Sequence, residues 1–275
     1  MHFSFLVSSA LGYQIPKLFD SNESFEEFDK ALDLLKQHGF DGVELNLNLH
    51  DEDKLARIRN SIKKRELRLS SVGTGLVYAQ DKLSFADSER SKREKAISIV
   101  KKLIEFASEE EASVIIGLIR GSGQLEVGQA LAQFRQSTVE CDSVAHQHGV
   151  RMALEAINRY ETPLLNSAGE VSAFIKSAKL TSTGLLLDTF HMNIEEQAIE
   201  TTIRRFCSEI VHFHIADSNR LPPGYGHLKI EEYLSLLQDQ GYDGWVSAET
   251  LPLPSNAEAV KATADFLRRY HFIRN

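Results

Sequence analysis

Short apolar runs alternate with amphipathic stretches along the whole chain. The apolar runs are rich in β-branched and aliphatic residues, and several are nearly continuous, as expected of parallel strands that are covered on both faces. Eight of these runs are predicted strands: Phe3–Val7, Gly42–Leu47, Arg68–Val72, Ser113–Ile119, Arg151–Ile157, Gly184–Leu187, Ile210–Ile215 and Trp245–Ala248.

The stretches between these runs carry apolar residues three and four positions apart, which predicts helices with one buried face. In Phe25–His38, for example, Phe28, Leu32 and Leu35 share a face, and Gly39 provides a C-terminal stop. The same spacing predicts helices over Glu94–Ser108, Ala168–Ala178, Glu195–Phe206, Ile230–Gln240 and Ala257–Tyr270.

A helical stretch follows each predicted strand, and 275 residues shared among eight units give about 34 residues per unit. The pattern therefore predicts the α/β class and a single (β/α)8 barrel, with one domain over residues 1–275. A doubly wound sheet is disfavoured because no glycine fingerprint follows the first strand, where only Gly12 occurs.

Composition and charge exclude several classes of protein. The chain is 42% hydrophobic and 25% charged, which is ordinary for a soluble globular protein. Its formal net charge of −8 argues against binding to nucleic acid, and its apolar runs, such as Val114–Ile119, are too short to cross a membrane. The two cysteines, Cys141 and Cys207, are far apart in sequence, so we expect free thiols in a reducing cytoplasm.

The ends of the last four predicted strands carry the candidate chemistry, because functional side chains of such barrels gather at the C-terminal ends of the strands. Taken singly, each acidic residue there has an ordinary explanation as a helix cap or an ion-pair partner. The set of candidate residues at these ends is Glu155, Glu161, Asp188, His191, His212, His214, Asp217, Arg220 and Glu249.

Within this set, Glu155, Asp188, His214 and Glu249 are spaced by 33, 26 and 35 residues, which matches one metal ligand for each βα unit. A charged residue at the end of a buried strand is costly unless it is paired or bound to a metal. Three carboxylates and one imidazole suit a mostly hard divalent cation; we favour Mn²⁺, with Mg²⁺, Co²⁺ or Zn²⁺ as alternatives.

Longer motifs make the interpretation more specific. The runs NRYET, DTFHMNIEE, HFHIADSNR, PPGYGH and SAET resemble the sugar isomerase and epimerase family that has a xylose-isomerase-like barrel. Within it they resemble the branch of D-tagatose 3-epimerase and its relatives, which includes keto-uronate epimerases. The resemblance covers essentially the whole chain, since VGTG and VIIGLIRG also fit. It implies a metal-dependent isomerase that epimerises a ketose or a keto-uronate such as 5-keto-L-gluconate; a ketose–aldose isomerase is the alternative.

The resemblance also implies roles for individual residues. Glu155, Asp188, His214 and Glu249 fall on the metal-ligand positions, and Glu155 and Glu249 double as the acid and base. The positions that hold the O1–O3 region of the sugar are occupied by Glu161, His191 and Arg220.

Two further residues remain open. His227 either contacts the substrate or caps the loop before the eighth helix. Arg120 either receives the carboxylate of an acid sugar at the barrel rim or pairs with an acid such as Glu155 or Glu44.

The expected mechanism is proton transfer next to a carbonyl group. A bound cation would stabilise the enediolate, and two carboxylates on opposite faces of the sugar would remove and return the proton. Two other classes fit less well. An endonuclease for abasic sites would need more histidines and a basic surface, and a non-catalytic sugar-binding protein has no need of opposed carboxylates. The small-molecule sugar is thus the expected partner, and homo-oligomers are compatible with the resemblance.

Overall fold

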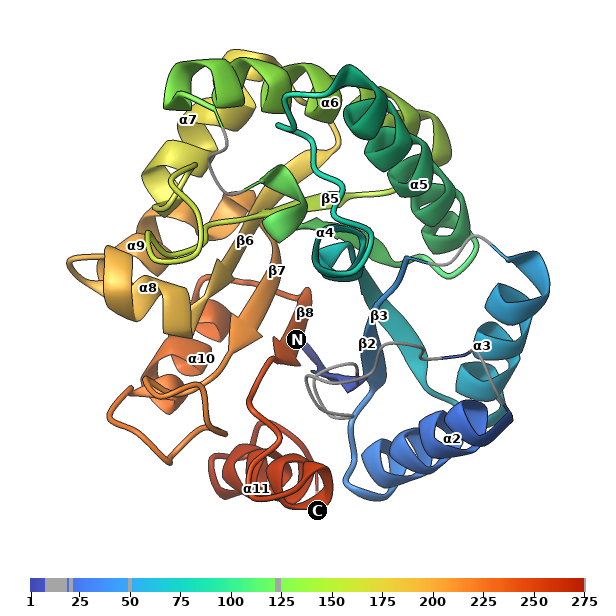
Figure 1. Ribbon diagram of the computed structural model, residues 1–275. Helices are drawn as coiled ribbons and strands as arrows, with labels where there is room; N and C mark the ends of the chain where they lie inside the picture. The colour runs from blue at the N-terminus through green and yellow to red at the C-terminus, as the bar shows by residue number, and fades with distance from the viewer. Residues whose placement is uncertain (8–18, 20–21, 49–50, 122–124, 275) are drawn as a thin grey trace.

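The strands of the protein form a closed barrel. The computed structural model describes residues 1–7, 19, 22–48, 51–121 and 125–274, so Gly12 lies outside the described residues. Eight parallel strands follow one another around the barrel in chain order, and β1 pairs with β8 to close it. Figure 1 shows the helices as a ring around the strands. The predicted (β/α)8 architecture is therefore confirmed.

The eight strands are short, between four and six residues each. They are β1 (His2–Leu6), β2 (Gly42–Asn46), β3 (Arg68–Gly73), β4 (Ser113–Ile116), β5 (Met152–Glu155), β6 (Thr183–Asp188), β7 (Ile210–Ile215) and β8 (Trp245–Ala248).

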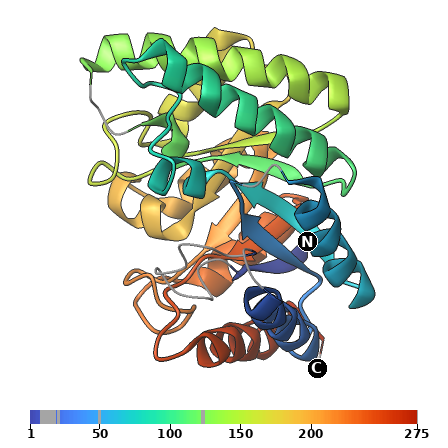
Figure 2. The ribbon, with the colours of Figure 1, turned by 45° about the vertical axis from the view of Figure 1, so that its right-hand side comes forward.

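The helices of the outer ring include two that pack side by side, α5 and α6, which Figure 2 shows along one side of the barrel. The helices are α2 (Asn22–Gln37), α3 (Glu52–Lys64), α4 (Gly75–Ala79), α5 (Arg90–Ser108), α6 (Val127–His148), α7 (Ala168–Ala178), α8 (Thr189–Glu195), α9 (Ile199–Phe206), α10 (Ile230–Asp239) and α11 (Asn256–Arg269). The described residues also form two short 3₁₀ turns, η1 (Leu118–Arg120) and η2 (Cys207–Glu209).

Two strands, β4 and β5, are clearly shorter than the sequence predicts, whereas the bounds of β2 differ by a single residue. The predicted strand Ser113–Ile119 ends before Gly117, where the backbone turns to φ −99° and ψ −120°. The predicted strand Arg151–Ile157 ends at Glu155. In both cases the residues that follow stay largely buried, so an apolar run alone does not mark where the strand stops.

The prediction of the helices was less complete. The predicted helix Glu195–Phe206 is two helices, since α8 ends at Glu195 and α9 begins at Ile199. The ranges of helices α3 and α6 were not predicted from the spacing of apolar residues, although a helical stretch was expected after each strand. In α6 the buried face includes Ser137, Thr138 and Asp142, and polar residues at buried positions hide the apolar period.

The barrel interior has an apolar side and a polar side. Ile115, Ala153 and Leu186, from β4, β5 and β6, form a small cluster separate from the main core. The residues next to them along each strand belong to the main core, which lies between the strands and the helices. Because successive side chains of a strand point to opposite faces, the small cluster faces the interior of the barrel. On β2 and β7 the buried interior residues include Glu44 and His212 instead. The polar side lies below the strand ends that carry the candidate ligands.

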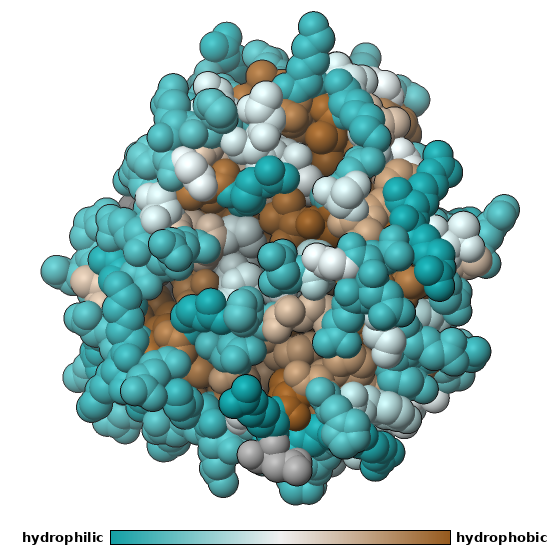
Figure 3. Space-filling model, turned by 180° about the vertical axis from the view of Figure 1, so that it is seen from behind, coloured by the Kyte–Doolittle hydropathy of each residue, from teal (hydrophilic) through white to brown (hydrophobic). Residues whose placement is uncertain are grey.

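Figure 3 shows the molecule from behind, relative to the view of Figure 1. Hydrophilic side chains cover most of the edge of this face, and apolar patches lie between them. Within the part of the chain that the structure describes, none of the helices is long and apolar enough to span a membrane. Cys141 and Cys207 are both buried and free, as the sequence predicts.

Candidate metal centre and active site

The four predicted metal ligands lie together at one end of the barrel. Glu155 and Asp188 are the last residues of β5 and β6, His214 is the last but one of β7, and Glu249 directly follows β8. One ligand atom from each residue lies within 4.8 Å of the others. Because parallel strands in a barrel end on the same rim, the spacing in the sequence becomes one compact cluster in space.

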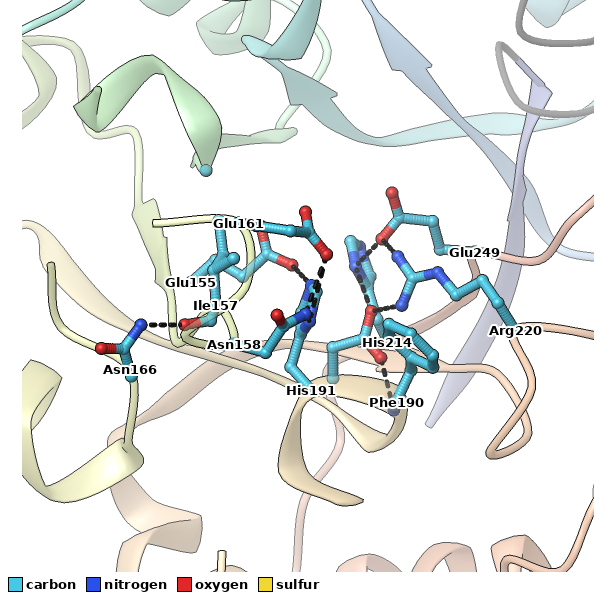
Figure 4. A network of polar contacts seen from close by, with 12 residues as sticks. Glu155, Ile157, Asn158, Glu161, Asn166, Phe190, His191, His214, Arg220 and Glu249 are labelled. Carbon is cyan, nitrogen blue, oxygen red and sulfur yellow. Dashed lines mark hydrogen bonds and ion pairs between the residues drawn. The ribbon is translucent and has the colours of Figure 1, made fainter. Parts of the chain in front are cut away.

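Arg220 holds two of these carboxylates on one side of the cluster (Figure 4). Its Nη1 lies 2.6 Å from Asp188 Oδ2 and its Nη2 lies 2.6 Å from Glu249 Oε2. The guanidinium also lies over the Phe190 ring, 4.8 Å from the ring centroid. These contacts fix the direction of both carboxylates, and the other oxygen of Asp188 accepts the Phe190 N–H and caps α8.

On the other side of the cluster, His191 faces Glu155 (Figure 4). The distance from His191 Nε2 to Glu155 Oε1 is 3.4 Å. Asn158, which the sequence analysis did not single out, lies 2.7 Å from His191 Nδ1 through its amide nitrogen and donates a hydrogen bond to Glu161 Oε1 at 2.8 Å. An amide nitrogen only donates, so Nδ1 of His191 accepts and Nε2 carries the hydrogen that points toward Glu155.

The charges of the cluster stabilise one another. Burial by itself would raise the pKa of Asp188, but the nearby Arg220 and His214 hold that pKa well below its usual range. Burial would lower the pKa of His214, but the carboxylates of Glu44 and Glu249 hold that pKa well above its usual value. Similarly, burial lowers the pKa of His191, and the Glu155 carboxylate more than compensates and raises it. The carboxylates therefore favour positive charge at the centre of the cluster.

The donor set fits a divalent cation. His214 Nδ1 is buried and makes no hydrogen bond to any described residue, although it lies 2.9 Å from Glu249 Oε2 and 3.6 Å from Asp188 Oδ2. A buried nitrogen that faces two carboxylates without a hydrogen bond is suited to bind a metal ion together with them. Three carboxylates and one imidazole are donors that hard or borderline divalent ions accept.

Comparison with known proteins shows the family of the chain. The family described as "Xylose isomerase-like TIM barrel" matches residues 32–270. The chain belongs to this family. It is 28% identical to D-psicose 3-epimerase of Enterocloster bolteae over 251 residues, 86% of this chain and 81% of the relative. It is 26% identical to D-psicose 3-epimerase of Agrobacterium fabrum over 232 residues, 81% of this chain and 79% of the relative. The protein is thus an enzyme of the isomerase class.

The same fold occurs in solved structures of other proteins. The structure of D-psicose 3-epimerase with D-tagatose from Clostridium cellulolyticum superposes with a TM-score of 0.81, at 20% identity, over 99% of each chain. At this identity the likeness shows the shared fold and nothing finer.

Arg120 is enclosed by backbone carbonyl groups instead of being open to the carboxylate of an acid sugar. Its side chain is fully buried, and its five N–H groups point to five backbone carbonyl oxygens. These oxygens belong to Ile116, Gly117, Glu155, Leu164 and Leu165. The guanidinium joins η1 to the backbone around the end of β5, so its donors are occupied by the scaffold and none is left for a substrate carboxylate.

We expect Arg120→Leu to destabilise the enzyme without changing its preference among substrates. The substitution removes five side-chain hydrogen bonds to backbone carbonyl oxygens, most of them buried, so the free energy of unfolding should fall by at least about 3 kcal/mol, measured by urea denaturation. Arg90→Leu is the control, because the Arg90–Glu94 pair is exposed and should contribute less than about 0.5 kcal/mol. A selective loss of kcat/KM for acid sugars at unchanged stability would contradict this interpretation.

The loop between β7 and α10 carries Arg220 and His227. Asp217 organises it, because its buried carboxylate accepts the backbone N–H groups of Ser218, Gly224 and Leu228. Burial would raise the pKa of Asp217, but these backbone donors hold it below its usual value. His227 is exposed, and its Nδ1 lies 2.9 Å from Ser218 Oγ. The structure therefore joins His227 to the loop and gives it no contact with the four candidate ligands among the described residues.

Two buried residues below the cluster, Glu44 and His212, were not assigned a function from the sequence. Glu44 Oε2 lies 2.8 Å from His212 Nε2, and His214 Nε2 lies 3.1 Å from the same carboxylate. The sequence does carry a signal for Glu44, namely an acidic residue within the apolar run GVELN. A charged side chain inside a buried strand requires a partner, but the pattern does not show which one.

Proposed function

We propose that the enzyme is a divalent-metal-dependent sugar epimerase that acts on a ketose or keto-uronate. The observation that carries the proposal is the cluster of Glu155, Asp188, His214 and Glu249, with ligand atoms within 4.8 Å of one another. Relatives named D-psicose 3-epimerase over about four fifths of the chain support a ketose that is epimerised at C3. The resemblance to keto-uronate epimerases supports an acid sugar as the second class of substrate.

The cation, with Mn²⁺ favoured, would be held by these four residues and would supply the positive charge that makes the C–H bond next to the carbonyl more acidic. Glu155 and Glu249 then act as base and acid. They project from β5 and from the end of β8, and Figure 4 shows them on opposite sides of the space between His191 and Arg220. One carboxylate takes the proton from one face of the sugar, and the other returns a proton to the opposite face.

Three further side chains orient the sugar in this proposal. His191 presents its Nε2–H beside Glu155, where it can donate to a substrate oxygen, and Asn158 holds the ring in that tautomer. Glu161 is 39% exposed and accepts from Asn158, so its second oxygen is available for a hydroxyl group. Arg220 lies against the cluster from the other side and can donate to a developing oxyanion.

The experiment that tests this function is a panel of ketohexoses and keto-uronates, incubated with Mn²⁺, Mg²⁺ or Co²⁺ and analysed for product stereochemistry. We expect inversion at the carbon next to the ketone. Excess EDTA should lower turnover by at least about 100-fold, because the metal contributes several kcal/mol to the transition state, and added Mn²⁺ should restore it. Aldose products would favour the ketose–aldose isomerase instead, and full activity in EDTA would exclude the metal-dependent mechanism.

The domain organisation and the cellular location of the enzyme are also proposals. We propose that residues 1–275 form one domain and that the enzyme is cytoplasmic. Both unpaired thiols, Cys141 and Cys207, support the location, because a reducing compartment keeps such thiols free.

A further inference from the structure

A buried polar cluster lies directly below the candidate metal centre. We define it as the Glu44 cluster: Glu44 on β2, Ser71 on β3, and His212 and His214 on β7. Glu44, His212 and His214 are 1%, 0% and 2% exposed, so no solvent reaches their side chains. Four polar side chains at this depth are costly unless each has a partner, and the contacts within the cluster show which partners they have.

Glu44 is the acceptor at the centre of this cluster. Its Oε2 accepts the Ser71 hydroxyl at 2.6 Å and lies 2.8 Å from His212 Nε2. His214 Nε2 lies 3.1 Å from the same carboxylate. An ionised carboxylate has no hydrogen to donate, so both imidazoles must present an N–H at Nε2. His212 stands at 85° to His214 with ring centroids 5.1 Å apart, which restricts rotation of the His214 ring.

This arrangement determines what the other side of His214 offers. With the hydrogen at Nε2 held by Glu44, the remaining ring nitrogen, Nδ1, faces Glu249 Oε2 at 2.9 Å and Asp188 Oδ2 at 3.6 Å. The ring therefore connects the buried carboxylate to the candidate metal centre, with one nitrogen directed to each. A metal-bound histidine commonly donates its second N–H to a carboxylate, which orients the ring and strengthens it as a ligand.

We propose that Glu44 is a positioning residue for the metal centre, holding His214 so that Nδ1 points to the cation and strengthening that nitrogen as a ligand. The inference rests on the proposed metal site. The alternative, in which Glu44, His212 and His214 themselves bind a second ion, is disfavoured because Nε2 of each imidazole already lies at hydrogen-bond distance from Glu44. Glu44 has no contact with the substrate in this proposal and acts only through His214.

The first test is Glu44→Gln, which keeps the size of the side chain but removes its charge. We expect Mn²⁺ to bind about 10- to 100-fold more weakly in calorimetric titrations, the usual effect of changing an outer-shell partner. Turnover should recover partly as Mn²⁺ is raised. Asp142→Asn is the matched control, because Asp142 is also a buried carboxylate that accepts hydrogen bonds, from Ser182 N–H and the Thr183 hydroxyl, at a distance from the centre. It should lower stability without changing the affinity for Mn²⁺.

The outcomes separate the proposal from the function on which it rests. If folded Glu44→Gln binds Mn²⁺ as tightly as the wild type, the positioning role is excluded while the metal site stands. If the wild type binds no divalent ion, the metal site fails and the positioning role fails with it. A second measurement needs no variant at position 44. In the Mg²⁺-loaded wild type, long-range ¹H–¹⁵N spectra should show His214 protonated at Nε2, and protonation at Nδ1 would overturn the proposal.

Discussion

Replacing Asp188 with Ala is expected to abolish turnover and to lower the affinity for Mn²⁺ by more than about 100-fold, beyond the usual effect of losing an outer-shell partner. Asp188 is fully buried, and its Oδ2 lies 3.6 Å from His214 Nδ1 and 2.6 Å from Arg220 Nη1. Without this carboxylate, the cluster retains three ligands, and Arg220 is left with Glu249 as its acidic partner. Metal content after dialysis and turnover at saturating Mn²⁺ are the measurements.

Asp188→Asn separates metal binding from folding. The side-chain oxygen of Asn can still accept the Phe190 N–H and cap α8, so this variant should keep its fold. It lacks the negative charge that faces the cation and Arg220, so the loss of metal affinity should persist. Normal metal content together with normal activity in either variant would show that the site is misassigned.

Substituting Glu155 or Glu249 with Gln is expected to lower turnover by about 10² to 10⁴-fold, the range for loss of a general acid or base. Gln keeps an oxygen that can bind a cation, but it does not accept a proton from carbon at neutral pH. Both variants should therefore retain part of their metal affinity while losing catalysis. This combination distinguishes them from Asp188→Ala, in which metal binding and turnover are lost together.

Reaction in D₂O tests the same roles in the wild-type enzyme. A carboxylic acid exchanges its hydrogen with solvent, so deuterium should appear at the epimerised carbon of the product. Mass spectrometry and NMR of the recovered sugar measure its amount and position. Product free of deuterium would favour a hydride shift and would remove Glu155 and Glu249 from the acid and base roles.

The ligand set shows how far a sequence pattern predicts a site in this fold. Glu155, Asp188, His214 and Glu249 are far apart in the chain, but each stands at the end of a predicted strand. Because all eight strands of a barrel run in parallel, residues at their ends meet at the same rim whatever their separation in sequence. The errors in the extents of β4 and β5 did not matter, since they moved only the limits of the strands.

For Arg120, the hydrophobic pattern of the sequence does not predict where the side chain points. Arg120 follows an apolar run in the same way as the candidate ligands do, so the sequence supports either a rim residue or a buried one. The backbone turns at Gly117 into η1, and this turn directs the guanidinium to five carbonyl oxygens inside the protein. The direction of a side chain after a turn depends on backbone angles that periodicity does not encode.

The sequence by itself therefore determined the eight strands, the rim and the four candidate ligands, because these follow from local periodicity and from the parallel direction of the strands. Only the tertiary structure decided the partners of the buried charges. Glu44 and His214 are 170 positions apart and lie on strands that are not neighbours, so no local pattern relates them. Their contact exists because the barrel closes, and closure brings β2 and β7 to face each other across one polar interior.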